Sequence, residues 1–339
     1  MPETSVVSAE VYRGDHLESL HRATAVACRT DGSVLFALGD PERPIFPRSA
    51  FKPFQALALM ELGGADRFGL TEREIALACS SHSGEPGHTA AVKAWLGRMG
   101  LGIDDLACGP QIPFDAPVSK ALFLSGQEET RAHHNCSGKH CGMLATCLTK
   151  GWPTDTYCDL DHPLQRWIRD TAKAVTGWPD MDRPEYDGCG APTMHLPIRR
   201  YARALACLAD PSGEPPRRRA ALERIGAAMR AHPWWVSGSD RSCADYIRAC
   251  PDVIAKMGSE GVYGIAIGSL GIGIAIKSDD GAERGSQVAA AGVLEALSVV
   301  DPDHAEAVRR WGRPILRNSL GDQVGRIAPS ATWLDGCRP

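Results

Sequence analysis

The chain has 339 residues, of which 43% are hydrophobic and 23% charged, and a formal net charge of −4. This composition is ordinary for a globular protein, and a chain of this length can bury one large core or two joined ones. A net charge of this sign gives no basic footprint for nucleic acid, so we expect no nucleic-acid partner. The longest apolar run, residues 262–276, is interrupted by glycine and shorter than the roughly 18 residues needed to cross a membrane, so we expect no membrane partner.

The cysteines and the N-terminal residues both bear on the cellular compartment. The chain begins without the basic segment and apolar run of a signal peptide, so secretion by that route is not expected. Twelve cysteines without such a signal favour reduced thiols over a disulfide framework, with some thiols buried as core filler and some available as metal ligands. The sequence therefore predicts a cytoplasmic protein.

The first part of the chain predicts antiparallel strands. Residues 5–12 are β-branched and partly alternating, which is typical of a strand. Residues 21–28 and 33–38 are separated by Asp31 and Gly32, a dipeptide that favours the tight turn of a hairpin.

Residues 48–53 (RSAFKP) join a turn-rich segment to an apolar run and predict a helix with Ser49 at or near its N-terminus. Lys52 follows one helical turn later, so the two side chains can face the same side. A serine hydroxyl becomes a strong nucleophile when a base removes its proton, and a neutral lysine amine can be that base. The Ser-x-x-Lys pattern also arises by chance, in which case Ser49 caps a helix and Lys52 is solvated.

The middle of the chain predicts helices and loops. A capping-box pattern over residues 71–74 predicts the start of a short helix. Further helices are predicted over residues 89–99, 163–175, 194–208, 217–230 and 243–249. Strands return at residues 262–267 and 271–277, which form a hairpin, and a long alanine-rich helix is predicted over residues 283–299.

Strands near both ends of the chain, with helices between them, predict an α+β protein whose antiparallel sheet is assembled from both termini. We expect a single domain over residues 1–339, with about residues 1–48 and 260–300 forming the sheet and about 49–255 forming helices and loops. The last forty or so residues are weakly patterned. A nucleotide-binding loop is not predicted, because the glycine-rich residues 268–273 do not open a helix.

Three further loops combine glycine with reactive side chains: residues 79–88 contain Ser81, residues 133–143 contain Cys136, and residues 185–193 contain Cys189. Functional residues often lie on loops held by a rigid scaffold. One such loop is readily explained by turn chemistry alone, whereas three loops of this kind favour a functional site.

The cysteines of these loops are candidate metal ligands. Cys136 and Cys189 could bind zinc together with Lys139, His140 or Cys141, with Cys243 a further candidate ligand, because thiolate and imidazole suit zinc. No Cys-x-x-Cys spacing is present, and buried free thiols account equally well for the same residues.

A second lysine would assist nucleophilic catalysis, and Lys256 is a candidate. An ordinary lysine, with a pKa near 10.4, is neutral in well under ~1% of molecules at pH 7, but burial or a neighbouring cation lowers that pKa. Lys256 follows the apolar residues 253–255 and precedes Gly258. A lysine with such neighbours more often ends an element with its amine in water.

Four motifs taken together resemble a known family. In chain order they are residues 48–53 (RSAFKP), 79–86 (CSSHSGEP), 135–140 (NCSGKH) and 187–192 (DGCGAP). They are similar to motifs of the Rhizobium etli-type L-asparaginases, often described as asparaginase II, and the match covers nearly the whole chain. The resemblance implies a fold similar to serine β-lactamases and serine-dependent glutaminases. It also implies a homodimer that hydrolyses L-asparagine to L-aspartate and ammonia.

The resemblance assigns the catalytic residues to two serine–lysine pairs that meet in one site, Ser49 with Lys52 and Ser81 with Lys256. In the implied mechanism Ser49, deprotonated by Lys52, attacks the side-chain amide carbon of asparagine. Ser81 and Lys256 then relay a proton to ammonia and later activate water. Backbone N–H groups at a helix start are expected to hold the oxyanion, and repulsion between two ammonium groups is expected to favour a neutral lysine.

The family's zinc site, two cysteines and a lysine plus water, maps onto Cys136, Lys139 and Cys189. Two thiolates neutralise the double charge of zinc, so the metal is expected to aid substrate binding or local structure and not to generate hydroxide. Because the ligand lysine must be neutral, zinc occupancy is expected to rise with pH.

The same motifs make Arg48, His82, Asn135 and Asp187 candidate substrate contacts, and Cys243 matches a further family cysteine near the site. Two alternatives stay open. One is a zinc-dependent amidohydrolase in which metal-bound water attacks directly, and the other is a non-catalytic amino-acid- or metal-binding protein of the same fold. The presence of a complete Ser-x-x-Lys motif favours an enzyme, since binding alone does not need it.

Overall fold

The computed structural model describes residues 4–338, and the chain divides into two compact units. Unit 1 comprises Met1–Ala50, Leu196–Gly213 and Asp245–Pro339, and unit 2 comprises Phe51–His195 and Glu214–Ala244. Each unit is assembled from segments that are distant in sequence, which explains why no linker is visible in the composition of the chain.

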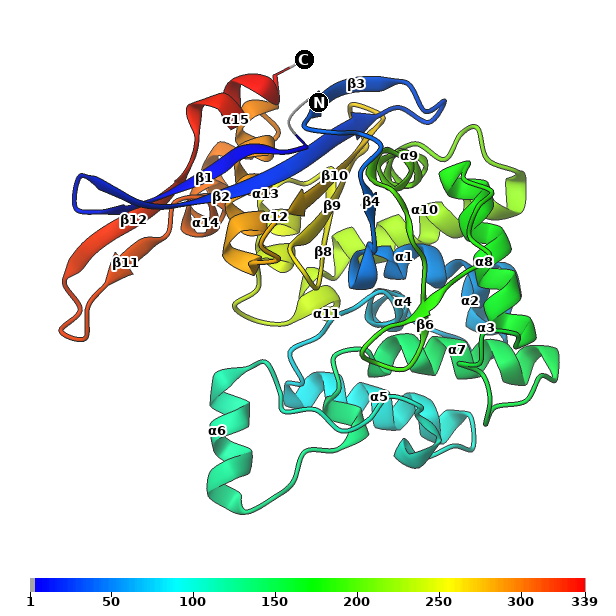
Figure 1. Cartoon of the computed structure of the whole chain (residues 1–339). Coiled ribbons are helices and arrows are strands. Elements are labelled where there is room, and N and C mark those ends of the chain that lie inside the picture. The colour runs from blue at the N-terminus through cyan, green and yellow to red at the C-terminus, as the bar shows by residue number, and fades with distance from the viewer. Residues whose placement is uncertain (1–3, 339) are drawn as a thin grey trace. The chain divides into compact units, whose positions relative to one another are not determined.

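Unit 1 is built on an antiparallel sheet, which has eight strands within residues 4–338 (Figure 1). The strands run in the order β11-β12-β1-β2-β10-β9-β8, and β3 also pairs with β2. Their bounds are β1 Val6–Arg13, β2 His16–Cys28, β3 Val34–Leu38, β8 Val253–Gly258, β9 Val262–Ile267, β10 Ile272–Ser278, β11 Ile315–Arg317 and β12 Gln323–Pro329. The predicted α+β class, with a sheet assembled from both termini, is confirmed.

The sheet differs from the prediction in its C-terminal part. It begins with β8 at Val253, not near residue 260, and it includes β11 and β12 from the weakly patterned end of the chain. All six residues of β8 are buried, so the strand lacks the alternation of polar and apolar residues that would reveal it. β12 is held in the sheet by β1, from the opposite end of the chain, over the register Ala9↔Pro329 to Arg13↔Gly325.

Helices cover both faces of this sheet. α9 (Ile198–Ala209) packs on β2, β9 and β10, and α13 (Glu283–Ala296) lies on the opposite face with α14 (Ala305–Gly312) and α15 (Ala331–Gly336) (Figure 1). Gly264 of β9 permits the close approach of α9, since a Cβ there would lie 2.1 Å from the hydroxyl oxygen of Tyr201. Tyr201 in turn donates a hydrogen bond to the carbonyl oxygen of Ala50 at 2.8 Å, which anchors the segment containing Ser49.

Unit 2 is mainly helical. Its α-helices are α1 Lys52–Gln55, α2 Leu57–Glu61, α3 Gly64–Arg67, α4 Glu72–Ala78, α5 Pro86–Arg98, α6 Ala116–Ser125, α7 Ser137–Lys150, α8 Pro163–Thr176, α10 Pro216–Ala231 and α11 Pro233–Ser237. Two short strands, β5 (Glu185–Tyr186) and β6 (Pro192–Thr193), pair around the Cys189 turn. α7 is central, packing against α2, α3, α4, α5 and α8, and its first three turns are buried. α12 (Ser242–Ala249) crosses from unit 2 to unit 1.

The predicted capping box at the start of α4 is confirmed. Thr71 accepts a hydrogen bond from the N–H of Glu74, whose carboxylate accepts one from the N–H of Thr71. The predicted α-helix starting near Ser49 is wrong in its bounds. Arg48–Phe51 form a 3-10 helix, and α1 begins at Lys52 with a proline in its first turn, where proline is best tolerated. Ser49 therefore precedes the α-helix and does not cap it.

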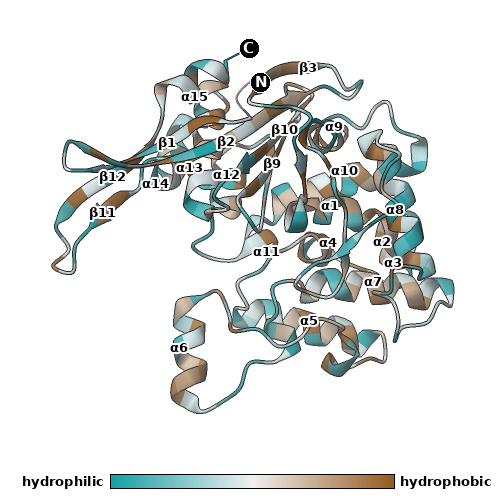
Figure 2. Ribbon diagram, viewed as in Figure 1, coloured by the Kyte–Doolittle hydropathy of each residue, from teal (hydrophilic) through white to brown (hydrophobic). Residues whose placement is uncertain are grey.

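α6 is unusual because it is apolar and none of its residues is buried (Figure 2). Phe123 is 85% exposed and Leu124 is 72% exposed. A helix that is apolar around most of its surface is normally buried, so α6 has the composition of a contact element. Within residues 4–338, no helix combines the length and the apolar character required to cross a membrane.

Candidate active site

The amine of Lys52 contacts the Ser81 loop inside unit 2. Lys52 is only 1% exposed; its Nζ donates to the carbonyl oxygen of Ser80 at 2.5 Å and lies 2.9 Å from Ser81 Oγ. Ser81 follows the end of α4, and its N–H donates to the carbonyl oxygen of Val236 in α11 at 3.0 Å. The structure therefore brings together a lysine and a serine that the family resemblance assigns to different pairs.

The residues after Ser81 are anchored to the end of α11 and the residues that follow it. Ser83 Oγ donates to the carbonyl oxygen of Ser237 at 2.8 Å, and the carboxylate of Glu85 accepts hydrogen bonds from the N–H and the hydroxyl of Ser239 at 2.7 and 2.9 Å. The position of the Ser81 hydroxyl thus depends on tertiary hydrogen bonds between two segments that are distant in sequence.

His82 is fully buried and uses both ring nitrogens within the protein. Nδ1 accepts a hydrogen bond from the N–H of Gly84 at 3.1 Å, so the neutral ring carries its proton on Nε2, which lies 2.8 Å from Ser137 Oγ. Burial lowers the pKa of His82 well below its ordinary value and keeps the ring neutral. His82 thereby connects the Ser81 loop to the start of α7, and its contact with a substrate stays a prediction.

Cys136, Lys139 and Cys189 come together in unit 2, and all three are at most 4% exposed. Cys136 is the N-cap of α7, Lys139 lies in the first turn of that helix, and Cys189 comes from the turn between β5 and β6. The Nζ of Lys139 lies 2.9 Å from Cys189 Sγ. Gly138 allows α7 to reach α4, since a Cβ there would lie 2.3 Å from the carbonyl oxygen of Leu77.

These three groups stabilise one another's charges. The hydrogen bond from Cys136 lowers the pKa of the Cys189 thiol against the effect of burial, and the Lys139 ammonium lowers it further. The same hydrogen bond and burial raise the pKa of Cys136 well above its ordinary value. Burial disfavours the charged Lys139 amine, but the neighbouring cysteine charges outweigh burial and raise its pKa. Within the cluster, Cys189 is therefore the thiol that most readily loses its proton.

The donor set of this cluster fits zinc. Two cysteine sulfurs and one amine nitrogen meet at the N-terminus of α7, and thiolates are preferred zinc ligands. In the part of the chain that the structure describes, no group of three or more His, Cys, Asp and Glu side chains could hold a metal ion. A metal here would therefore need the neutral Lys139 amine as its third protein ligand.

Tyr157 orients His140 beside the cluster, and the sequence analysis missed it. The N–H of Ala107 donates to the Tyr157 hydroxyl at 2.8 Å, and this hydroxyl lies 2.7 Å from His140 Nδ1. This contact fixes the orientation of the His140 ring, and His140 contributes to lowering the pKa of Cys189. Burial lowers the pKa of His140 itself. No local pattern marks Tyr157, whose role comes only from packing.

Asn135 and Asp187 are partly exposed at the edge of this cluster. The N–H of Asn135 donates to Gln111 Oε1 at 3.2 Å, and its side-chain oxygen lies 2.9 Å from Cys136 Sγ. Asp187 closes the turn that carries Cys189, since its carboxylate accepts a hydrogen bond from the N–H of Gly188 at 2.6 Å. The Asp187 charge also contributes to the raised pKa of Lys139. Both predicted substrate contacts therefore remain accessible.

Ser49 and Lys256 lie in unit 1. Lys256 is 1% exposed on β8, and its Nζ donates to the carbonyl oxygen of the next residue at 2.9 Å. Gly258 points to the same side of β8, and a Cβ there would lie 2.5 Å from the carbonyl oxygen of Pro47 and 3.0 Å from the N atom of Ala50. The segment that contains Ser49 therefore packs against the strand that carries Lys256.

Arg48, directly before Ser49, has a φ of 51°, in the left-handed region. A residue with a side chain pays roughly 1–2 kcal/mol for this conformation, and such residues gather at functional sites. The strain is held in place by the tertiary contacts of the neighbouring residues, including the hydrogen bond from Tyr201 to Ala50. Sequence reasoning proposed Arg48 as a substrate contact and missed its unusual backbone.

A buried lysine amine beside a serine hydroxyl defines the class of site, one that can activate a hydroxyl for attack on a carbonyl or amide carbon. The comparison with protein families agrees. The family model described as L-asparaginase II matches residues 9–329, and the chain belongs to the L-asparaginase II family. Membership of this family supports an amidohydrolase activity.

Solved structures similar to this chain are distant from it. The native form of Mglu is 14% identical, with a TM-score of 0.45, over 83% of this chain and 66% of Mglu, so the match spans about two thirds of that protein. A β-lactamase from Mycobacterium bovis is 12% identical, with a TM-score of 0.41, over 85% of this chain and 93% of the other. The D-alanine carboxypeptidase AmpC from Burkholderia cenocepacia is 10% identical, with a TM-score of 0.40, over 84% and 92%. A comparison with curated protein sequences found no match.

Proposed function

We propose that this chain is an L-asparaginase that hydrolyses the side-chain amide of L-asparagine to L-aspartate and ammonia in the cytoplasm. Membership of the L-asparaginase II family supports the substrate class. The observation that carries the chemistry is the buried amine of Lys52, 2.9 Å from the hydroxyl of Ser81 and three residues from Ser49. A buried lysine in reach of a hydroxyl is suited to proton transfer and has no evident role in binding alone.

In the proposed mechanism Ser49 is the nucleophile. Its oxygen forms a bond to the side-chain amide carbon of asparagine, and its proton passes to Lys52. Lys52 returns a proton through Ser81 to the amide nitrogen, the C–N bond breaks, and ammonia leaves. Water then attacks the resulting ester, giving its proton back along the same path, and releases L-aspartate and the Ser49 hydroxyl. Lys256 serves as a second base during this step.

The substrate contacts follow from exposure and charge. Arg48 is a candidate partner for the substrate carboxylate, because a guanidinium binds a carboxylate through paired N–H groups. Asp187 and Asn135 are candidate partners for the substrate's ammonium and amide groups. Both are partly exposed at the edge of the thiol–amine cluster, which consists of Cys136, Lys139 and Cys189. His82 is assigned to positioning the Ser81 loop.

We also propose that Cys136, Lys139 and Cys189 hold zinc, which would help to orient the substrate or stabilise the local structure. The support is the convergence of two sulfurs and an amine in a buried position. Metal analysis of purified protein tests the proposal. Zinc is expected in the wild type and not in Cys136→Ala or Cys189→Ala, and equal zinc content in all three would exclude these ligands.

Ammonia release from L-asparagine, measured by steady-state kinetics, tests the function. Turnover is expected in the wild type, with a loss of many orders of magnitude in Ser49→Ala, as removal of a nucleophile can cost ~10⁶ in kcat. Chelation is expected to raise KM more than it lowers kcat. A kcat near zero after chelation, restored by zinc, together with a mild effect of Ser49→Ala, would support the metal-water alternative. No release by folded, zinc-loaded wild type would support a binding protein.

The same proposal includes a homodimer, and α6 supports it. Its exposed apolar side chains, with Phe114 and Ile112 just before it, form a surface that a second copy can cover by the same surface, as two-fold dimers do. Light scattering on Phe123→Asp tests this role against Leu320→Asp, which changes a similarly exposed residue of unit 1. We expect a monomer for the first variant and a dimer for the second. A dimer in both would exclude α6 as the interface.

A further inference from the structure

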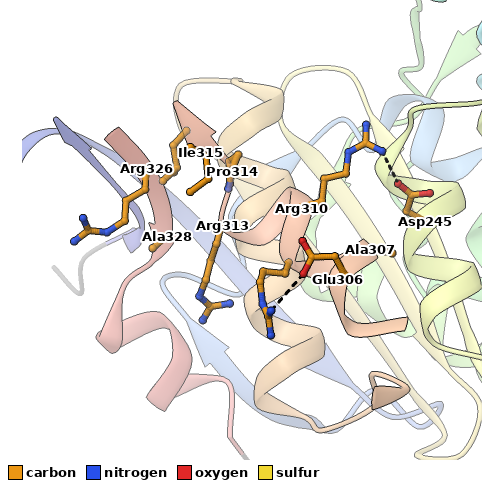
Figure 3. Close-up of a pocket in the computed structure, with 11 residues that line it drawn as sticks. Asp245, Glu306, Ala307, Arg310, Arg313, Pro314, Ile315, Arg326 and Ala328 are labelled. Atoms are coloured by element: carbon orange, nitrogen blue, oxygen red, sulfur yellow. Dashed lines mark hydrogen bonds and ion pairs between the residues drawn. The ribbon is translucent and has the colours of Figure 1, made fainter. Parts of the chain in front are cut away.

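Unit 1 contains a pocket of about 740 Å³ that no step of the proposed reaction uses (Figure 3). One wall comes from α14 and the residues directly after it, and the other comes from β12, with β11 at the edge of the sheet. Its volume is within the roughly 300–1,000 Å³ of small-molecule sites. The pocket is therefore large enough for a ligand bigger than a single inorganic ion.

The pocket is rich in arginine. Its lining includes Arg309, Arg310, Arg313 and Arg326 and only two acidic residues, a formal excess of two positive charges in a chain whose net charge is −4. A guanidinium presents a rigid set of N–H donors that matches the oxygens of carboxylates and phosphates. The excess charge favours anions, and the donor geometry favours oxyanions in particular.

Two of these arginines, Arg309 and Arg313, keep donors for a ligand. Each of them meets one carboxylate through Nη1, whereas Arg326 has its guanidinium carbon 4.5 Å from the ring centroid of Tyr12 and donates through Nη1 to the carbonyl oxygen of Gly14 at 3.3 Å. A guanidinium has five N–H donors, so these contacts leave others on each residue. The ion pair of Arg309 with Glu306 is largely exposed, and exposed ion pairs contribute little to stability. A ligand oxyanion can therefore share Arg309 with Glu306 or replace Glu306 as its partner.

The surface between the arginines is apolar. Pro314, Ile315 and Ala328 lie there, and Ile315 is 44% exposed although it is a large aliphatic residue (Figure 3). A simple inorganic anion would use the arginines and leave this apolar surface in water. The combination favours a ligand that has charged groups on one part and an apolar or ring-shaped body on another.

We propose that this pocket binds a small organic anion with at least two negative charges, carried on carboxylate or phosphate groups. The charged groups meet Arg309 and Arg313, and the body of the ligand covers Pro314 and Ile315. Either source of negative charge satisfies the guanidinium donors, so the two are separated by experiment.

Trp311 provides a reporter beside the pocket. Its Nε1 donates to Asp245 at 2.8 Å, and the guanidinium carbon of Arg310 lies 5.0 Å from its ring centroid. Asp245 also contacts Arg310 at 3.7 Å. A ligand that binds Arg310 therefore changes the surroundings of the indole and with them the fluorescence of Trp311. Trp311→Phe should remove this change in fluorescence while calorimetry still detects binding.

Calorimetric titration of the full chain at low salt tests the proposal with three probes: ADP, citrate and neutral adenosine. The pocket variant is Arg309→Gln/Arg313→Gln. The matched control, Arg166→Gln/Arg224→Gln, removes two exposed, ion-paired arginines of unit 2 and changes the net charge equally. Circular dichroism checks the fold of each variant, and Arg309→Gln alone is a second pocket variant if the double variant fails that check.

We expect saturable binding of ADP or citrate, at least about tenfold weaker in the pocket variant and within twofold of wild type in the control, because each arginine removed takes away charge-assisted hydrogen bonds. Binding of ADP alone would identify phosphate, and binding of citrate alone would identify carboxylate. The proposal is overturned if neither anion binds, if adenosine binds as well as ADP, or if the pocket variant binds like wild type.

Discussion

Unit 1 and unit 2 each hold one serine and one lysine of the four predicted catalytic residues, but they hold them in different ways. In unit 1, Lys256 lies in a strand, registered opposite Gly264, and the segment of Ser49 packs against that strand. In unit 2, Lys52 begins a short helix and Ser81 lies in a loop that depends on hydrogen bonds to α11 and the residues after it. Lys256 is held by the backbone hydrogen bonds between β8 and β9, whereas Ser81 depends on a few hydrogen bonds to a segment distant in sequence. The unit 2 pair should therefore be more easily disturbed.

After the loss expected for Ser49→Ala, the next largest effect should come from removing the Ser81 hydroxyl. Ser81→Ala is expected to lower kcat by about 10²–10⁴, the range for a group that transfers protons, because Lys52 loses the hydroxyl at 2.9 Å. Ser80→Ala is the matched control, since the buried Ser80 Oγ has no hydrogen-bond partner among residues 4–338. Steady-state kinetics on the two variants measures the difference, and equal losses would show that Ser81 has no special role.

The unit 1 pair is tested by Lys256→Met, which keeps the length and burial of the side chain. If Lys256 acts as a second base, kcat should fall by about 10²-fold with little change in KM. Lys277→Met on β10, a half-buried lysine of the same sheet, is the control. A variant that loses thermal stability but keeps kcat would assign Lys256 to the structure of the sheet alone.

The close packing of α7 on α4, which positions the thiol–amine cluster of unit 2, is tested by Gly138→Ala. The added methyl would lie 2.3 Å from the carbonyl oxygen of Leu77, so α7 must shift, at a cost of about 1–3 kcal/mol in the free energy of unfolding. Gly97→Ala in α5 adds the same group with no neighbour within 4 Å and should stabilise by up to about 1 kcal/mol. Denaturant unfolding measures both, and similar values for the two would exclude the close approach.

The smallest effect concerns acid sensitivity. His88 is buried in unit 2, and burial lowers its pKa to about 4. Between pH 6.5 and about 4 the unfolded chain binds this proton and the folded chain does not, so stability is complete above pH 6.5 and falls as the pH decreases. One such histidine contributes a slope of about 1.4 kcal/mol per pH unit.

His88→Gln should reduce this slope in denaturant unfolding at several pH values, even if it lowers stability at pH 7. His304→Gln, which changes an exposed histidine of unit 1, should leave the slope unchanged. An unchanged slope in His88→Gln would mean that the acid sensitivity comes from other buried groups.

The sequence by itself determined the features that depend on neighbouring residues. The hairpin of β2 and β3, the hairpin of β9 and β10, and the capping box of α4 were predictable, because turn chemistry and side-chain periodicity act over a few residues. The proximity of Cys136 and Lys139 also follows from one helical turn. The α+β class followed from the order of these elements along the chain.

Only the tertiary structure decided which distant residues meet. Lys52 reaches Ser81 across 29 positions, and Lys139 reaches Cys189 across 50. The pairing of β12 with β1, the buried strand β8 and the role of Tyr157 likewise left no local pattern. Contacts of this kind form because burial and backbone hydrogen bonding of whole elements outweigh the entropy of closing long loops, and that balance is a property of the packed chain and not of any short stretch of it.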